Sequence, residues 1–289
     1  MDWITNKFKQ KLSQSSTSQN KNDVQPYIGP RPFDRNDKDE KRFFGRDYEA
    51  DEIISLILGH RLVLVYAQSG VGKTSILNAK ISPMLEEEYG FQVLPSARIG
   101  NISNSENYPS SKMAINSSDI ENAYMFSAMQ SLLKKDVDSQ SLLDKQQLTD
   151  FLKSYYPPTI VDQETGEVKN QVLVFDQMEE LFTFYPNDKW REQQKDFFQQ
   201  VTKALKDNIF LRIVFVIRED YLAELDPFLE LLPERLRPRF RLERLQKENA
   251  LLAIKKPLEE MNPNLYNSFK LVFILTLLHY RIKHDFDFI

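Results

Sequence analysis

Short apolar runs alternate with amphipathic stretches along most of the chain. Four runs of mainly aliphatic and aromatic residues lie at Arg61–Tyr66, Phe91–Ile99, Val172–Asp176 and Phe210–Asp220, and a shorter run of alternating polarity lies at Arg239–Leu245. Apolar runs of this length are typical of strands that are buried on both faces. The pattern therefore predicts five strands, separated by segments long enough to hold helices.

The segments between these runs have the apolar spacing of helices. Asp47 is a suitable N-cap for one helix, and a second helix is expected to start near Gly72. The buried faces of the predicted helices contain Ile53, Ile54, Ile57, Ile76, Leu77 and Ile81, then residues within Ile120–Tyr156, then Trp190, Phe197, Phe198, Val201 and Leu205. Strands that alternate with helices predict an α/β fold with a mainly parallel sheet, in which ligands bind beyond the carboxyl ends of the strands.

Both ends of the chain and one internal segment lack this alternation. Residues 1–25 are rich in Ser, Gln, Asn and Lys, which predicts a flexible polar tail before an ordered part that starts near Pro26. Residues 101–119 are rich in Ser and Asn and predict a long surface loop. The apolar run Phe269–Leu278 is shorter than the roughly 18 residues of a membrane span, so it predicts a buried helix or strand.

The composition of the chain excludes several kinds of functional site. The chain has 289 residues, no cysteine, three histidines and a net charge of −4. The absence of cysteine excludes disulfides, thiolate nucleophiles and cysteine-bound zinc, and it fits a cytoplasmic protein. The charge does not indicate a general binder of nucleic acid or membranes, and the polar N-terminus does not have the pattern of a secretory signal.

The stretch "VYAQSGVGKTSIL" has the pattern of a phosphate-binding loop between a strand and a helix. Such a loop needs converging backbone N–H groups, a lysine for the β- and γ-phosphates and a hydroxyl for Mg²⁺. Lys73 and Thr74 supply the side chains, and only the usual first glycine is replaced, by Ala67. The predicted nucleotide-binding residues are Gln68, Ser69, Gly70, Val71, Gly72, Lys73, Thr74 and Ser75.

Two further strand ends carry charged residues of the kind that an NTPase needs. Asp176 ends a buried strand and is predicted to direct Mg²⁺ together with Thr74. Glu179 and Glu180 follow, as candidates to polarise the attacking water or as solvated residues at a helix start. Arg218 ends the next strong strand, as a sensor of the γ-phosphate or as the partner of a nearby acid.

The tetrapeptide "NKND", at residues 20–23, matches the guanine-reading pattern N-K-x-D. In GTPases that motif follows a strand, whereas here it lies in a polar tail, so the match is attributed to chance. ATP is therefore the expected nucleotide.

Several motifs together resemble a known family. "YIGPRPFDRNDKDEKRFFGRDYEADEI", "VYAQSGVGKTSILNAKISPML", "LVFDQMEELFTFYP", "VFVIREDYLAELDPF" and "LLPERLRPRFRLERL" occur in this order. The chain resembles the novel STAND NTPase 1 family from about Tyr27 to Glu260. The resemblance implies a P-loop NTPase fold, a three-layer α/β/α sandwich around a five-stranded sheet of order 5-1-4-3-2.

The resemblance also implies roles for individual residues. Phe44, Gly45 and Arg46 would help to cover the adenine and phosphates, and Pro257 would contact the nucleotide from a switch motif. The same resemblance supports the roles given above to Asp176, the two glutamates and Arg218. The glycine of the switch motif is replaced by Lys255.

Members of this family are ATP-controlled switches, closed with ADP and opened into a homo-oligomer by ATP, in signalling or anti-phage defence. The implied domains are a tail at residues 1–25, an NTPase domain at 26–245 and the start of a helical and winged-helix switch region at 246–289. Since that region stops early and no sensor repeats follow, a truncated gene or a separate sensor or effector protein is expected.

Three functions remain open at this point. The first is an ATP-binding regulatory switch that hydrolyses ATP slowly. The second is a nucleotide-binding fragment that acts by association without turnover. The third is a DNA-linked AAA+-type ATPase, in which the arginines of "PERLRPRFRLER" would contact phosphates unless they pair with nearby acids or face a neighbouring subunit.

Overall fold

The computed structural model describes residues 27–29, 31–100, 120–133, 139–162, 166–183 and 188–261. These residues form two units. The larger unit consists of Pro32–Glu40 and Arg46–Leu245, and the smaller includes Lys41–Gly45 and the described residues from Gln246 onwards.

A parallel sheet of six strands forms the core of the larger unit. Its order is β2-β6-β7-β1-β8, and β3 also pairs with β6. The strands are β1 (Leu62–Ala67), β2 (Gln92–Val93), β3 (Ala97–Arg98), β6 (Gln171–Asp176), β7 (Leu211–Arg218) and β8 (Arg239–Arg241). The predicted order 5-1-4-3-2 is therefore confirmed, with β2 and β3 sharing the edge position. Pro95 lies between these two short strands and has no N–H to donate, which explains why the predicted second strand is divided.

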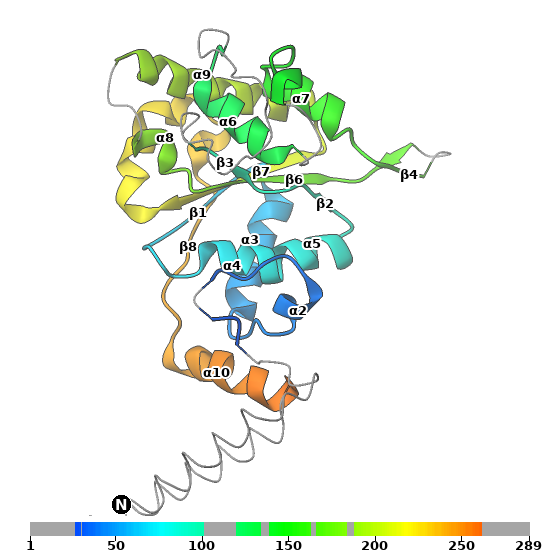
Figure 1. The fold of residues 1–289 in the computed structure, drawn as a ribbon, viewed down its shortest axis with the longest axis vertical. Helices are drawn as coiled ribbons and strands as arrows, with labels where there is room; N and C mark the ends of the chain where they lie inside the picture. Colours follow the sequence, from blue (N-terminus) through cyan, green and yellow to red (C-terminus); the bar gives the residue numbers. More distant parts are fainter. Residues whose placement is uncertain are drawn as a thin grey trace, which may run out of the picture. The chain divides into compact units, whose positions relative to one another are not determined.

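Helices cover both faces of the sheet, as the three-layer prediction requires (Figure 1). One face carries α3 (Asp47–Gly59), α4 (Lys73–Ile76), the π-helix η1 (Leu77–Ile81) and α5 (Ser82–Glu87), and the other carries α6 (Ala123–Leu132), α7 (Leu148–Tyr155) and α9 (Asp188–Asp207). The shorter elements are α2 (Asp37–Glu40), η4 (Ser139–Leu142), the hairpin β4 (Ile160–Asp162) and β5 (Glu167–Val168), α8 (Glu180–Thr183), η5 (Glu219–Leu231) and η6 (Pro233–Leu236).

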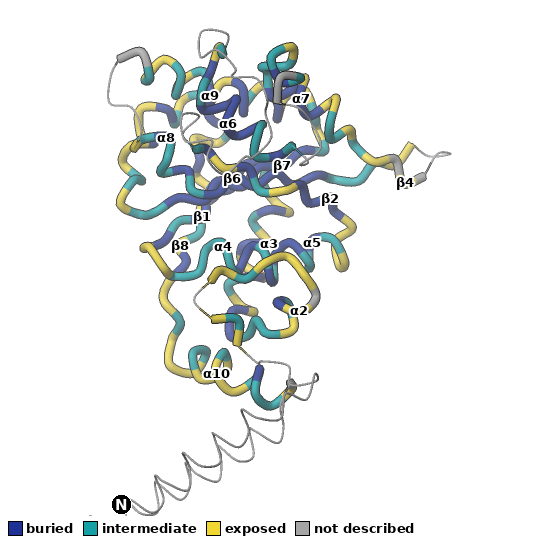
Figure 2. The backbone as a smooth tube through the Cα atoms, in the orientation of Figure 1, coloured by how far each residue is buried: buried dark blue, intermediate teal, exposed yellow. Residues whose placement is uncertain are grey.

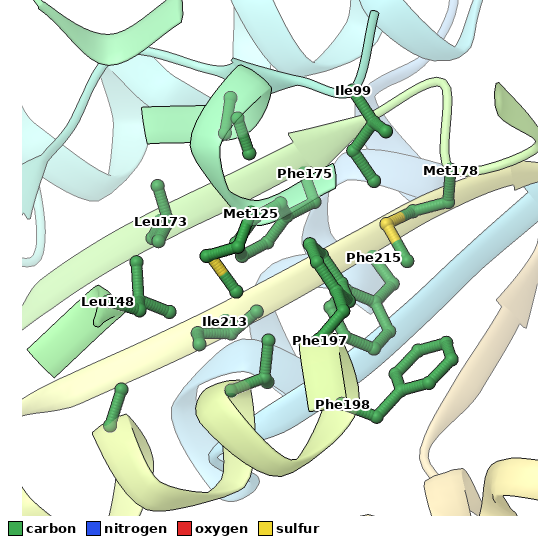
Figure 3. Packing of buried hydrophobic residues seen from close by; sticks show 14 of the residues in the cluster. Ile99, Met125, Leu148, Leu173, Phe175, Met178, Phe197, Phe198, Ile213 and Phe215 are labelled. Carbon is green, nitrogen blue, oxygen red and sulfur yellow. The ribbon is translucent and has the colours of Figure 1, made fainter. Parts of the chain in front are cut away.

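The central strands are almost completely buried, as Figure 2 shows for β6 and β7. Phe175 packs edge to face against Phe197 of α9, with ring centroids 5.3 Å apart, and against Phe215, at 5.8 Å (Figure 3). Each such aromatic pair contributes about 0.5–1.5 kcal/mol beyond the burial of area. This packing fixes the ends of β6 and β7, where Asp176 and Arg218 lie.

The smaller unit contains α10 (Lys247–Met261), which includes Pro257. Tyr27 donates a hydrogen bond of 2.7 Å to the carbonyl of Ile254. Gly45 has φ +82°, and a Cβ placed on it would lie 2.4 Å from the carbonyl oxygen of Asn249. Gly45 is thus required by both its backbone angle and the close approach of α10.

Some sequence predictions differ from the structure or fall outside it. Asp47 is the first residue of α3, and the N-cap position belongs to Arg46, whose side chain makes no capping bond. The tail at residues 1–25, the loop at 101–119 and the run Phe269–Leu278 lie outside the described residues. In the part of the chain that is described, no helix is both long and apolar enough to cross a membrane.

Candidate functional site

The carboxyl ends of the central strands bring the predicted residues to one edge of the sheet. In the parallel register, Ala67 is opposite Arg218 and Arg98 is opposite Asp176. Asp176 ends β6, one position after the pair Phe175–Phe215. Since β7 lies between β6 and β1, the loop after β1 faces charged residues from two neighbouring strands.

The loop between β1 and α4 has the backbone that a phosphate cradle requires. Gly70 and Gly72 have φ of +76° and +103°, angles that residues with side chains rarely adopt, and no atom lies within 4 Å of a Cβ built on either glycine. Ala67 ends β1, is fully buried and does not have a positive φ. The replacement of the usual first glycine therefore causes no backbone conflict.

The ammonium group of Lys73 lies inside this loop. Its Nζ donates to the carbonyl oxygens of Ala67 and Gln68, at 3.2 and 3.3 Å. Burial lowers the pKa of Lys73, whereas the charges of Glu179 and Asp176 act in the opposite direction. The lysine is thus a half-buried cation on which the charges of the predicted catalytic and metal-directing acids act.

Thr74 and Asp176 lie in direct contact. The Thr74 hydroxyl donates to Oδ2 of Asp176 at 2.8 Å, and the backbone N–H of Gln177 donates to Oδ1 at 3.0 Å. Gln177 has φ +60°, a left-handed conformation that is uncommon for a residue with a side chain. The hydrogen bonds from the Thr74 hydroxyl and the Gln177 amide fix the orientation of the Asp176 carboxylate.

These two residues fit a magnesium site. Mg²⁺ prefers oxygen ligands and usually keeps several waters, with one or two protein ligands completed by substrate phosphates. Among the described residues, no group of three or more His, Cys, Asp or Glu could hold a metal ion. A hydroxyl and a carboxylate beside a phosphate cradle are the donor set that magnesium with a nucleotide would use.

The two candidate glutamates have different surroundings. Glu179 accepts a hydrogen bond of 3.2 Å from the backbone N–H of Arg218 and is the acid that most raises the pKa of Lys73. Burial, together with the charges of Glu179 and Asp176, raises the pKa of Glu180 to about 7, although the charge of Arg98 acts in the opposite direction. The charge of Glu179 thus acts on Lys73, whereas the pKa of Glu180 is influenced by Arg98 at the end of β3.

Arg218 has features of both interpretations that the sequence left open, the partner of a nearby acid and the sensor of the γ-phosphate. Its guanidinium pairs with Asp220 and lies 5.5 Å from the centroid of the Tyr221 ring. Its Nε is buried without a hydrogen-bond partner, and its charge lowers the pKa of Lys73. The salt bridge is therefore present, and it holds the arginine close enough to act on the loop lysine.

Arg46 supports the loop from within the protein. It is 5% exposed, and it donates to Glu49 at 2.7 Å, to the carbonyl of Glu243 at 2.8 Å and to the carbonyl of Val71 at 3.2 Å. The Val71 contact reaches the phosphate loop, and the Glu243 contact reaches the segment after β8. Arg46 thus links the loop after β1 to the segment that follows the neighbouring edge strand, β8.

The helix that follows the loop is held by an extended segment before α2. Ser75 accepts a hydrogen bond of 3.3 Å from the backbone N–H of Phe33, and Asn78 donates one of 3.0 Å to the carbonyl of the same residue. Asn78 lies in η1, the π-helical continuation of α4. Ser75 therefore serves the scaffold of the loop through its hydroxyl.

Other predicted contacts stay predictions. Phe44, Gly45 and Pro257 belong to the smaller unit, so their contact with a nucleotide is not tested. Gln68 and Ser69 are exposed, as a loop that meets a ligand would be.

Sequence reasoning missed Arg98. It is the last residue of β3, and its Nη2 lies 4.0 Å from Oδ2 of Asp176. The available signal was its position at the end of the second apolar run, because charged residues at strand ends mark this edge of the sheet.

Two of the five arginines in the segment predicted to touch DNA or acids pair with acids. Arg241 donates to Glu219 at 3.0 Å and contacts Glu243 at 2.8 Å, and Arg235 contacts Glu230 at 2.9 Å. Arg239 donates to the carbonyl of Leu236. These contacts favour the pairing interpretation over a phosphate-binding surface.

Several solved structures resemble this chain at low sequence identity. A Walker-type ATPase of Pyrococcus abyssi is 19% identical, with a TM-score of 0.46, over 81% of this chain and 62% of that one. Domain III of the Thermotoga maritima replication initiation protein DnaA is 14% identical, with a TM-score of 0.42, over 76% and 72%. The ORC2 protein of Aeropyrum pernix is 13% identical, with a TM-score of 0.45, over 81% and 54%. At these identities the likeness concerns the fold alone.

The sequence match is more specific. No curated protein matches the chain, but the profile of the family described as novel STAND NTPase 1 matches residues 26–274. This range includes the phosphate loop, the Asp176 strand and α10. Because the match covers most of the chain, the protein belongs to the novel STAND NTPase 1 family.

Proposed function

We propose that the protein is a regulatory switch that binds ATP with Mg²⁺ and hydrolyses it slowly. The observation that carries this proposal is the 2.8 Å contact between Thr74 and Asp176, which joins a phosphate loop to the acid of a second strand. Membership of an NTPase family supports nucleotide binding. ATP, slow turnover and a signalling or defence role are proposed on the resemblance and on the site residues.

In this proposal the loop Gln68–Ser75 binds the phosphates. Backbone N–H groups around Gly70 and Gly72 and the N-terminus of the helix that starts at Lys73 favour negative charge. The Lys73 ammonium, held by two loop carbonyls, balances the charge of the β- and γ-phosphates. Arg46 keeps the loop in place through the carbonyl of Val71.

Thr74 and Asp176 would hold the magnesium ion, which, when bound, neutralises phosphate charge and orients the terminal phosphate. Asp176 is 2% exposed and receives hydrogen bonds from Thr74 and from the amide of Gln177. Its position is therefore fixed before any ligand arrives. This preorganisation supports electrostatic stabilisation of the developing charge.

Glu179 is proposed as the residue that orients the attacking water and accepts its proton. The amide of Arg218 holds Oε2 of Glu179, and this carboxylate acts on Lys73 more strongly than Asp176 does. Glu180 is the alternative base, since a pKa of about 7 suits proton transfer near neutral pH. The hydrogen bond between Glu179 and the amide of Arg218, which is opposite Ala67 at the start of the loop, favours Glu179, because a base must first be within reach of the water.

Arg218 is proposed as the sensor of the γ-phosphate. It ends β7, its backbone N–H donates to Glu179 and its side chain pairs with Asp220. Loss of the γ-phosphate would therefore change the charge balance around one arginine and one glutamate together. Such a two-state change is what a switch needs. Opening into a homo-oligomer is proposed as its output, and a separate sensor or effector protein is proposed as its partner.

The test is an ATPase assay of the full chain, comparing the wild type with Lys73→Ala. The wild type should release phosphate slowly and the variant should be at background, whereas equal rates would reject the proposal. A single-turnover assay distinguishes the slowly hydrolysing switch from a nucleotide-binding fragment that acts without turnover. Tightly bound ATP with no product would identify a nucleotide-binding protein without turnover.

A further inference from the structure

The end of β3 is fixed on both of its edges. On one edge, Arg98 pairs in parallel register with Asp176 of β6. On the other, the backbone N–H of Arg98 donates to the Ser131 hydroxyl and that of Gly100 donates to the Ser127 hydroxyl, each at 2.8 Å. The two serines are one helical turn apart on α6, so they satisfy the free edge of this short strand. The base of the Arg98 side chain therefore has a defined position.

From this position the guanidinium faces buried negative charge. Nη2 of Arg98 lies 4.0 Å from Oδ2 of Asp176; the arginine side chain is 53% exposed and the aspartate side chain only 3%. A buried carboxylate is costly unless a positive charge or hydrogen bonds compensate for it. Two neutral donors, the Thr74 hydroxyl and the Gln177 amide, bond this carboxylate directly. Arg98 contributes a full charge beside it.

The same carboxylate oxygen is the proposed magnesium ligand. Oδ2 of Asp176 accepts from Thr74 and faces Arg98, so a divalent cation bound there would stand next to the guanidinium. Two cations compensating one carboxylate repel each other. Because the arginine is half exposed and fixed only at its backbone, it can turn into solvent or toward Glu180 when the metal arrives.

We propose that Arg98 is a positioning residue that balances the buried charge of Asp176 before loading and yields to Mg²⁺ when the nucleotide binds. It thereby sets the magnesium concentration at which the site loads. This inference rests on the proposed nucleotide site. The lowering of the Glu180 pKa by Arg98 agrees with a guanidinium that faces this acidic group.

The experiment titrates Mg²⁺ into the full chain with a fluorescent ADP analogue and compares the wild type with Arg98→Gln and Arg98→Lys. Removal of the competing charge should lower the midpoint in Arg98→Gln by about 3- to 5-fold, the range of a partly exposed ion pair. Arg98→Lys, which keeps the charge, should stay within about 2-fold of the wild type. The control is Arg235→Gln, which removes one arginine charge from the pair with Glu230 and should leave the midpoint unchanged.

A second readout separates positioning from general stability. Without Mg²⁺ the Arg98→Gln protein should melt at a lower temperature than the wild type, and saturating Mg²⁺ with ADP should remove the difference. An equal loss of stability under both conditions would assign Arg98 a structural role and overturn the inference. An unchanged magnesium midpoint would also overturn the inference. A higher midpoint would overturn it too, because it would mean that Arg98 helps to bind the phosphates.

Different results would reject the proposed nucleotide site and the proposed role of Arg98. If the wild type showed no magnesium-dependent binding, the proposed nucleotide site would fail and this inference with it. If the wild type responded to Mg²⁺ and Arg98→Gln responded identically, only the role of Arg98 would be rejected.

Discussion

The hydroxyl of Thr74 donates a 2.8 Å hydrogen bond to the carboxylate of Asp176, although the two residues are 102 positions apart in the chain. Thr74 lies in α4, after the loop that follows β1, and Asp176 ends β6; β7 lies between these two strands. The contact therefore depends on the register of three strands. It joins the two proposed magnesium ligands at the carboxyl end of the sheet.

Replacement of either partner should abolish the effect of magnesium on nucleotide binding. Thr74→Val keeps the shape of the side chain and removes the donor, and Asp176→Asn keeps the size and removes the charge. The factor by which Mg²⁺ increases the affinity for the nucleotide should be at least about tenfold smaller in each variant than in the wild type. Calorimetric titrations with Mg²⁺ and with EDTA measure this, and a wild-type response to magnesium in either variant would contradict the assignment.

The two glutamates should separate kinetically. Glu179→Gln should lower kcat by about 10²–10⁴-fold, because the proposed base is lost. Nucleotide affinity should change little, since the amide oxygen of glutamine can still accept from Arg218. Glu180→Gln is the matched control and should lower kcat by less than about tenfold. The reverse order of the two effects would move the catalytic role to Glu180.

Stability should depend on the ionisation of Glu180. Its pKa is about 7 in the folded protein, above the ordinary value of 4.5, so the folded state binds more protons than the unfolded state between these values. The free energy of unfolding should therefore fall as pH rises from about 4.5 to about 7 and stay low above that.

Glu180→Gln, which is neutral throughout, should remove this loss. After allowance for the half-exposed side chain, the variant should gain about 1 kcal/mol over the wild type at pH 8 and nothing at pH 4.5. Urea unfolding at the two pH values, without nucleotide and Mg²⁺, gives the comparison. An equal difference at both pH values would show that Glu180 does not titrate in this range.

Gly45→Ala should loosen α10 within the smaller unit. The new Cβ would lie 2.4 Å from the Asn249 carbonyl and at a φ of +82°, which costs about 1–3 kcal/mol in backbone strain alone. Hydrogen exchange of residues 247–261 should become faster. Gly29→Ala, with φ +78° and no atom within 4 Å of its Cβ, separates strain from the clash. Equal effects of both variants would mean that the contact with Asn249 is unimportant.

The sequence predicted most of the fold because its strands are buried and apolar throughout. The runs around Val63, Val172 and Ile213 became β1, β6 and β7, and the resemblance supplied their order. The break at Pro95 and the conformation of Gln177 were not foreseen. Both depend on local backbone geometry that apolar spacing does not encode.

Some candidate site residues could be recognised from the sequence, and their roles stay predictions. Lys73, Thr74 and Asp176 stand out because phosphate and magnesium chemistry requires those residue types after strands. Arg98 does not stand out, because its proximity to Asp176 depends on the register of β3 against β6 and on two serines of α6. The scaffolding contacts of Arg46 with Val71 and Glu243 join segments that no local pattern connects.

The central claim is that the loop after β1 binds a nucleotide through Lys73. Calorimetric titration of the full chain with ATP and Mg²⁺ tests it most directly, with circular dichroism to show that the wild type and Lys73→Ala are equally folded. We expect one bound nucleotide per wild-type chain and at least about tenfold weaker binding by the variant. Equal affinities of the two folded proteins, or no binding by the wild type, would contradict it.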